Sequence, residues 1–195
     1  MSTYFQKNRL NLIIVDFDNT LFFTNNINFK SYKKTFNYFN VKLSKKEFNL
    51  YAGLSKRDFY KKIFKKKKFD VNKVFDLKKE YYKKSVNLVK ANYLLLDFLR
   101  KMKNQNVKIA LVSNASRYTI SLVLNKFSIE NFFDAILTSD DVEKTKPNPT
   151  AFKKILKKFK ATSKNVIVID DDKSGIIAAK KCNIQSMTFN PQKKN

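Results

Sequence analysis

The chain has 195 residues, 43% of them apolar, which is enough to bury one sizeable core and a smaller second module. One cysteine and no histidine exclude an internal disulfide and a zinc site of the histidine and cysteine type, so any metal ion would need oxygen ligands. The net charge of +25 favours loose attraction to polyanions, but the lysines are spread along nearly every predicted helix, which disfavours a specific nucleic-acid site.

The first predicted element is a short buried strand that ends at two carboxylates. In LNLIIVDFDNTL at residues 10–21, the run rich in Ile and Val stops at Asp16, and Asp18 follows two residues later. Such a run is typical of a strand covered on both faces in a parallel sheet, and ligands bind at the carboxyl ends of such strands. Carboxylates this close repel one another, which a cation, protonation of one of them, or both would relieve. Two solvated aspartates in a turn are the alternative.

Helical spacing replaces the strand pattern after Leu21. Ser44 with Glu47 forms a capping box at the start of one predicted helix, and Ser55 with Asp58 resembles a second. A further helix is predicted over residues 72–90. Its expected apolar side is formed by Val74, Leu77, Tyr81 and Leu88. The first helix of the block has an expected apolar side formed by Phe29, Tyr32, Phe36 and Phe39. We interpret residues 22–91 as an all-helical insertion.

Strands and helices alternate from Asn92, which is the predicted N-cap of a helix carrying Leu95, Phe98, Leu99 and Met102 on its apolar side. Strands are predicted at 107–112, 135–138, 166–169 and 185–189, and helices at 116–126 and 174–182. A further helix is predicted with Asn148 as its N-cap and Pro149 as its first helical residue. Single helices between strands imply right-handed crossovers and a parallel sheet. We therefore predict an α/β fold, a Rossmann-like doubly wound parallel sheet made by residues 1–21 and 92–195, with residues 22–91 as an inserted all-helical cap.

Polar side chains follow four of the predicted strands. In chain order they are Asp16 and Asp18, then Ser113 and Asn114, then Lys146, and then Asp170, Asp171 and Asp172. Because the carboxyl ends of parallel strands meet at one edge, these groups can gather around one small ligand. Carboxylates suit Mg²⁺ and nucleophilic attack, whereas hydroxyl, backbone N–H and ammonium groups suit an anion. The expected ligand is a phosphate group.

The chain resembles the haloacid dehalogenase superfamily of phosphohydrolases. The matching segments, in the family's order, are Asp16-Phe17-Asp18-Asn19-Thr20-Leu21, Ser113-Asn114, Lys146-Pro147 and Asp170-Asp171. The resemblance spans essentially the whole chain and is to the subgroup with a helical cap after the first strand, which includes phosphoglycolate phosphatase-like enzymes and β-phosphoglucomutase. It implies a Mg²⁺-dependent phosphatase that hydrolyses a small phosphorylated metabolite, a phosphate monoester, through an aspartyl-phosphate.

The resemblance also implies roles for individual residues. Asp16 would be the nucleophile, and Asp18 would protonate the leaving group and then deprotonate water. Asp16, the backbone carbonyl of Asp18 and Asp171 would hold Mg²⁺, with Asp170 as a further ligand or a partner through water. The phosphoryl group would be bound by Ser113, Asn114 and Lys146, and Asp172 is a weaker candidate for the metal.

Three positions in the predicted cap and one glycine in the core complete the candidate site. Gly53 lies in YAGLSKRD, which resembles the cap loop that reaches over the substrate, although a helix end that needs glycine explains it equally well. Ser55 and Lys56 are candidates for binding the leaving group, and a solvated position at the cap rim is the alternative for Lys56. Gly175 stands where many members have a further carboxylate, and Asp170 would supply that acid instead.

Two other functions are alternatives to this prediction. The family's mutases use a cap-side histidine, and this chain has none, so a sugar-phosphate mutase is disfavoured. A non-enzymatic, lysine-rich protein that binds polyanions or nucleic acid on the same fold is the second alternative. The apolar run at the N-terminus is too short for a signal peptide, and no run is long enough for a membrane span, so we expect a cytoplasmic protein. We also expect a monomer.

Overall fold

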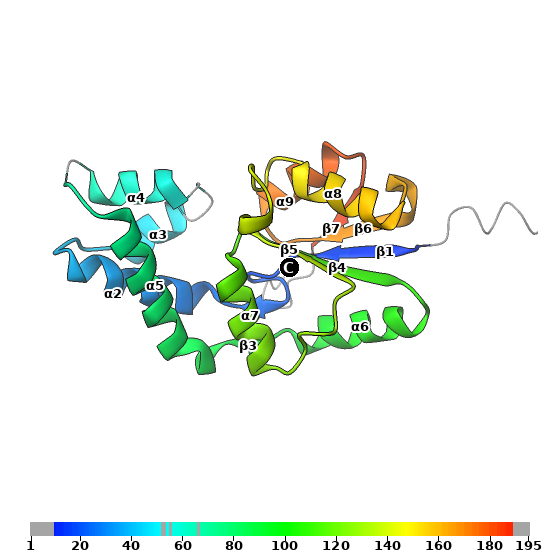
Figure 1. Ribbon diagram of the computed structural model, residues 1–195, viewed down its shortest axis with the longest axis horizontal. Helices are drawn as coiled ribbons and strands as arrows, with labels where there is room; N and C mark the ends of the chain where they lie inside the picture. Colours follow the sequence, from blue (N-terminus) through cyan, green and yellow to red (C-terminus); the bar gives the residue numbers. More distant parts are fainter. Residues whose placement is uncertain (1–9, 52–53, 55, 66, 189–195) are drawn as a thin grey trace, which may run out of the picture. The chain divides into compact units, whose positions relative to one another are not determined.

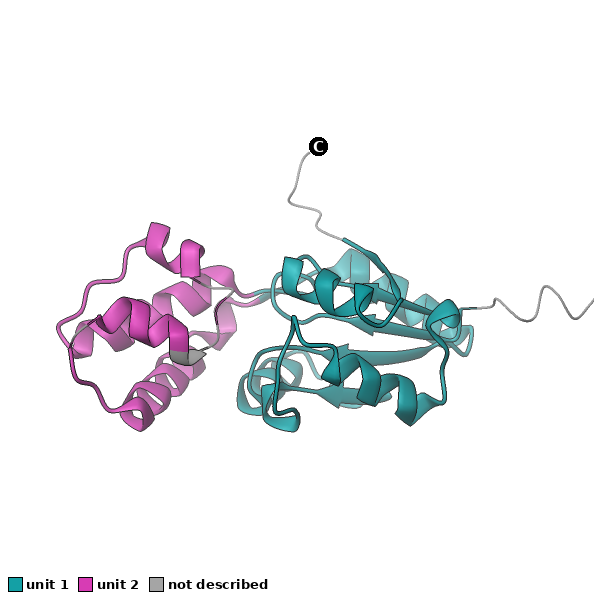
Figure 2. Ribbon diagram, turned by 90° about the horizontal axis from the view of Figure 1, so that it is seen from above, with its two compact units in different colours: residues 1–23, 90–195 teal, residues 24–89 magenta. Residues whose placement is uncertain are grey.

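The computed structural model describes residues 10–51, 54, 56–65 and 67–188, and only the backbone of residues 56 and 57. The chain divides into two compact units (Figure 2). One, the core unit, comprises residues 1–23 and 90–195, and the other, the cap unit, comprises residues 24–89. The sequence-based division at 22 and 91 differs from this one by assigning residues 22–23 and 90–91 to the insertion.

A parallel sheet of five strands forms the centre of the core unit, in the order β5-β4-β1-β6-β7. These strands are β1 (Leu12–Val15), β4 (Lys108–Val112), β5 (Ala135–Leu137), β6 (Val166–Ile169) and β7 (Gln185–Met187). The predicted run of Ile and Val becomes the central strand β1, which pairs in parallel with β4 on one side and β6 on the other. Every residue of β1 is buried, as expected for a strand covered on both faces.

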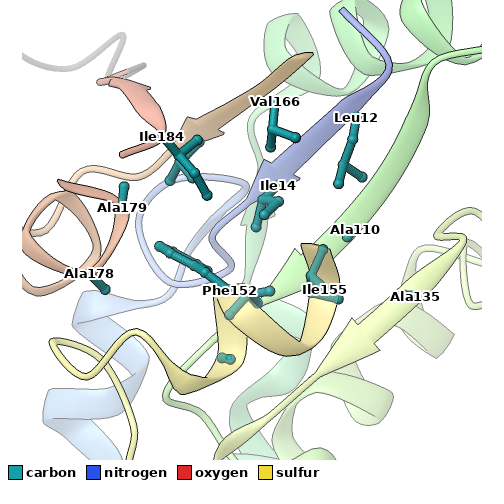
Figure 3. Close-up of a cluster of buried hydrophobic side chains, with 13 residues drawn as sticks. Leu12, Ile14, Ala110, Ala135, Phe152, Ile155, Val166, Ala178, Ala179 and Ile184 are labelled. Atoms are coloured by element: carbon teal, nitrogen blue, oxygen red, sulfur yellow. The ribbon is translucent and has the colours of Figure 1, made fainter. Parts of the chain in front are cut away.

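Helices cover both faces of this sheet. They are α6 (Tyr93–Asn104), α7 (Arg117–Lys126), α8 (Thr150–Phe159) and α9 (Lys173–Lys180), with short 3₁₀ turns η2 (Ser139–Asp141) and η3 (Ser163–Asn165). Helices α8 and α9 lie on one face and α6 and α7 on the other (Figure 1). Phe152 and Ile155 of α8 pack with Leu12 and Ile14 of β1 in one apolar cluster (Figure 3). The predicted doubly wound α/β fold is confirmed.

The cap unit consists of helices α2 (Asn25–Tyr38), α3 (Lys45–Tyr51), α4 (Lys56–Phe64) and α5 (Val71–Ser85), followed by the 3₁₀ turn η1 (Val86–Leu88). Its core is rich in buried aromatic side chains, including Phe36, Phe48, Phe59, Tyr60 and Phe64. The chain segments just before and just after the cap unit pair with each other as a short antiparallel ribbon of β2 (Phe22–Phe23) and β3 (Lys90–Ala91). Among the helices of the described segments, none combines the length and apolar character needed to cross a membrane.

Local signals predicted several helix starts correctly, but α8 begins one residue later than predicted, with Pro149 and not Asn148 as its N-cap. The Ser44 hydroxyl accepts a hydrogen bond from the Glu47 N–H (3.1 Å), and the Glu47 carboxylate accepts one from the Ser44 N–H (2.9 Å), so the capping box is confirmed. The Asn92 side chain caps α6 by accepting from the Leu95 N–H (3.2 Å). The second proposed box, at Ser55, lies outside the described residues.

Two predictions of apolar helix faces are wrong in part. Helix α5 ends at Ser85, so Leu88 lies in η1 with 59% of its surface exposed, and Tyr82 is buried more deeply than Tyr81. On α6 the buried stripe is Leu95, Leu96 and Leu99, and Phe98 is exposed. Four other predicted positions hold, because Val74 and Leu77 on α5 and Leu95 and Leu99 on α6 are buried.

Candidate active site

Strand pairing brings Asp16 and Asp170 to the same level at the edge of the sheet. Val15 of β1 is in register with Ile169 of β6, and the Asp16 N–H donates to the Ile169 carbonyl (2.9 Å). Asp16 and Asp170 each follow one of these paired residues, and both are buried. Two carboxylates far apart in the sequence are therefore neighbours because their strands are adjacent and parallel.

The Lys146 ammonium lies between these two carboxylates. Its Nζ is 2.7 Å from Asp16 Oδ1, 2.7 Å from Asp170 Oδ2 and 3.3 Å from the carbonyl oxygen of Val112, at the end of β4. Only 3% of the Lys146 side chain is exposed. An ammonium group has three hydrogens, so these three acceptors use all of its donor capacity. Lys146 thus ties together the ends of β1, β4 and β6.

Asn114 holds the backbone of Lys146 in place. Its Nδ2 donates to the Lys146 carbonyl (3.0 Å), and its Oδ1 accepts from the Lys146 N–H (3.0 Å). These bonds use the Oδ1 atom and one of the two Nδ2 hydrogens of Asn114, so its side chain positions Lys146. The predicted role of Asn114 in binding the phosphoryl group stays a prediction.

Asp171 is held by the hydroxyl of Thr20. Thr20 Oγ1 donates to Asp171 Oδ1 (2.8 Å) and accepts from the Asp171 N–H (3.1 Å). The loop after β1 and the loop after β6 are therefore joined by two hydrogen bonds across 151 positions of sequence. The sequence places Thr20 in the first segment that matches the family but does not indicate its contact with Asp171.

The buried charges of the site are not balanced. Burial raises the pKa of Asp16 well above its ordinary value, and Asp170 and Asp18 add to that increase against the opposing effect of Lys146. Burial alone would lower the pKa of Lys146, but Asp16 and Asp170 outweigh it, so the pKa of this lysine is raised. Burial also raises the pKa of Asp171. The carboxylates thus concentrate more negative charge than Lys146 neutralises.

The residues present fit a divalent cation. Asp16, Asp170 and Asp171 each offer one carboxylate oxygen, and these three atoms lie within 4.8 Å of one another. Three carboxylates and one ammonium leave two negative charges when all are ionised, which one divalent cation would balance. Carboxylate oxygens are hard ligands of the kind that Mg²⁺ prefers.

The remaining core candidates, Ser113, Asp18 and Asp172, lie in the loops that follow β4, β1 and β6. The Ser113 hydroxyl is buried and accepts from the Ala115 N–H (3.0 Å), which still allows it to donate its own proton. Asp18 is half-buried and raises the pKa of Asp16, so its charge acts at the site. Asp172 is exposed and caps α9 by accepting from the Ser174 N–H (2.7 Å), which explains this acidic residue without a metal.

Gly175 makes room for Asp170. A Cβ atom at residue 175 would lie 1.8 Å from Asp170 Oδ2 and 2.1 Å from its Cγ, far inside contact distance. The absence of a side chain at Gly175, in the first turn of α9, therefore allows the Asp170 carboxylate to occupy its position.

The cap candidates are described less fully. Gly53 and Ser55 lie outside the described residues, and Lys56 is the first residue of α4 with only its backbone described. All three belong to the cap unit. Their roles stay predictions.

Fold and site together define an α/β protein with a cluster of carboxylates and a buried lysine at the edge of a parallel sheet. The family model of haloacid dehalogenase-like hydrolases matches residues 13–189. The chain therefore belongs to the haloacid dehalogenase-like hydrolases, and the predicted family and its enzyme class are confirmed.

Curated relatives and solved structures agree with this assignment. The chain is 28% identical to pyrophosphatase PpaX of Oceanobacillus iheyensis, over 89% of this chain and 80% of that protein. It is 29% identical to pyrophosphatase PpaX of Bacillus cereus, over 87% and 78%. Among solved structures, CbbY from Rhodobacter sphaeroides in complex with phosphate has a TM-score of 0.83 at 17% identity, covering 95% of this chain and 90% of that one. A predicted phosphoglycolate phosphatase from Haemophilus somnus has a TM-score of 0.79 at 20% identity, covering 91% and 84%.

Proposed function

We propose that the protein is a Mg²⁺-dependent phosphatase that hydrolyses small phosphate esters or anhydrides through an aspartyl-phosphate on Asp16. The observation that carries this proposal is the buried Asp16 carboxylate, which is hydrogen-bonded to Lys146 and grouped with Asp170 and Asp171 at the edge of the sheet. Membership of the hydrolase family and the phosphatase names of its relatives support it.

The first step would be attack by Asp16 on phosphorus. An Asp16 oxygen forms a bond to phosphorus while the bond from phosphorus to the leaving oxygen breaks, and Asp18 gives its proton to that oxygen. In the second step Asp18, now a carboxylate, takes a proton from water. The water oxygen attacks the phosphorus, the bond between phosphorus and Asp16 breaks, and inorganic phosphate is released.

Asp16, Asp170, Asp171 and the backbone carbonyl of Asp18 would hold Mg²⁺. When bound, the ion neutralises phosphoryl oxygens and so lowers the repulsion between an anionic substrate and an anionic nucleophile. The Ser113 hydroxyl would donate a hydrogen bond to the phosphoryl group. Lys146 already uses its three hydrogens on protein acceptors, so its main role would be to keep Asp16 ionised and oriented.

Inorganic pyrophosphate is the substrate that the curated relatives favour, because several proteins that match most of this chain are named pyrophosphatases. A small phosphate monoester is the substrate class that the sequence motifs favour. Both chemistries use the same attack on phosphorus, and they differ only in the leaving group, which is phosphate or an alcohol. Gly53, Ser55 and Lys56 are the proposed cap residues for leaving-group selection.

The decisive experiment compares Asp16→Asn with Asp97→Asn. Wild-type protein is expected to release phosphate from an aryl phosphate, a panel of small monoesters or inorganic pyrophosphate with Mg²⁺, and to stop when a chelator is added. Asp16→Asn should abolish turnover because an amide is a poor nucleophile, and Asp18→Asn should lower it by about 10²–10⁴-fold. Asp97 is exposed on α6, so the same change there should leave turnover intact. Substantial turnover by Asp16→Asn would rule out the covalent mechanism.

A further inference from the structure

A chain of hydrogen bonds connects Asn92 to Asp171 through the buried Thr20 within the core unit. Asn92 is 2% exposed, its Nδ2 donates to the Thr20 carbonyl (3.0 Å), and its N–H donates to the Leu21 carbonyl (2.9 Å). Thr20 is 0% exposed, and its hydroxyl makes the two hydrogen bonds to Asp171 described above. The backbone of the first loop is thus held on one side by Asn92 and holds Asp171 on the other.

The position of the Thr20 hydroxyl depends on the backbone to which it is attached. Threonine is β-branched, so rotation about its χ1 bond is restricted, and a fixed backbone places the hydroxyl in a narrow region. That hydroxyl donates to Oδ1 of Asp171 and accepts from the N–H of the same residue, which limits both the backbone and the carboxylate of Asp171. Asp171 contributes one of the three oxygens of the acidic cluster.

The amide of Asn92 performs two separable tasks. Its Oδ1 accepts from the Leu95 N–H and caps α6, whereas its Nδ2 donates to the Thr20 carbonyl. An aspartate at this position would keep the acceptor and lose the donor. The two tasks can therefore be separated by a single substitution of nearly identical shape.

From these contacts we propose that Thr20 and Asn92 are positioning residues that set the affinity of the acidic cluster for Mg²⁺. Thr20 acts directly on Asp171, and Asn92 acts on Asp171 through Thr20. This inference rests on the proposed function, because the cluster is the one assigned there to Mg²⁺. Residues that orient a ligating carboxylate commonly change metal affinity by about 10–100-fold when they are replaced.

The test measures Mg²⁺ binding without substrate, by calorimetry and by the Mg²⁺-dependent rise in melting temperature. Thr20→Val keeps the shape of the side chain and removes the hydroxyl, and it should raise the dissociation constant for Mg²⁺ by about 10–100-fold. Thr20→Ser restores the hydroxyl and should bind Mg²⁺ nearly as well as wild type. Thr35→Val is the matched control, because Thr35 is also fully buried but its hydroxyl donates to the Ser31 carbonyl in the cap unit. It should leave Mg²⁺ affinity unchanged.

Asn92→Asp tests the second part of the chain. It should weaken Mg²⁺ binding less than Thr20→Val does, and it should cause no further loss when combined with Thr20→Val, because its effect passes through the Thr20 hydroxyl. If Thr20→Val does not fold, Thr20→Ala carries the same test.

The outcomes separate this inference from the proposed function. Wild-type protein that neither binds Mg²⁺ nor releases phosphate would overturn both. Wild-type protein that does both, with Thr20→Val matching its Mg²⁺ affinity, would overturn the positioning role alone. Additive losses in the double variant would show that Asn92 does not act through Thr20.

Discussion

Replacing Gly175 with alanine tests whether the position of Asp170 depends on the missing side chain. The added Cβ would lie 1.8 Å from Asp170 Oδ2, whereas ordinary contact begins at 3.4 Å, so the carboxylate must move by about 1.6 Å, the difference between these distances. The carboxylate accepts from Lys146 Nζ (2.7 Å) and from the Asp172 N–H (3.0 Å). Because both bonds restrain it, the displacement must break at least one of them.

The cost follows from the burial of the ion pair. Asp170 and Lys146 are both buried, and separating one partner of a buried pair costs about 3–5 kcal/mol. Alanine is better than glycine in a helix by about 0.5–1 kcal/mol, so the net loss should be about 2–4 kcal/mol. At about 2–4 °C per kcal/mol for a chain of this length, the melting temperature should fall by roughly 4–16 °C.

The assay is thermal unfolding of four proteins without Mg²⁺: wild type, Gly175→Ala, Asp170→Ala and the double variant. When Asp170 is alanine, the clash is absent, and Gly175→Ala should be neutral or slightly stabilising. The sign of its effect should therefore reverse between the two backgrounds. Lys173→Ala, an exposed change in the same helical turn, is the control and should alter stability by less than about 0.5 kcal/mol. Equal effects of Gly175→Ala in both backgrounds would refute the argument.

Two further predictions concern the charges of the site. Lys146→Met removes the ammonium group that two buried carboxylates share. It should lower the free energy of unfolding, measured with urea, by about 3–5 kcal/mol and should also abolish phosphate release. Unchanged stability would show that this ammonium does not stabilise the two carboxylates. Burial raises the pKa of Asp16 and of Asp171 in the folded protein. The metal-free fold therefore loses stability as the pH rises above the pKa values that these groups have in the unfolded chain. A bound cation removes this effect. The rise in melting temperature caused by Mg²⁺ should therefore grow as the pH increases from about 5 to 8, and a rise that shrinks over this range would contradict the assignment of the cluster.

Much of the site could be predicted because its order follows from strand pairing. Asp16, Ser113 and Asp170 each come directly after a buried strand, and adjacent parallel strands place such residues at one edge whatever the details of the loops. The preference of Asn92 for a helix N-terminus is equally local, since the cap and the N–H that it accepts from are three residues apart.

The chain sequence by itself therefore determined the elements, their parallel arrangement and the carboxylates that follow the strands, because hydrophobic periodicity and capping act over a few residues. It also singled out Lys146, which lies in the loop after η2. Only the tertiary structure decided which side chains support which. The Asn114 amide holds Lys146 over 32 positions, and the Thr20 hydroxyl holds Asp171 over 151. Asp172 caps a helix, and Gly175 leaves space for Asp170. These contacts depend on how loops from separate strands approach one another, and no local pattern in the sequence encodes the direction of a hydrogen bond across that distance.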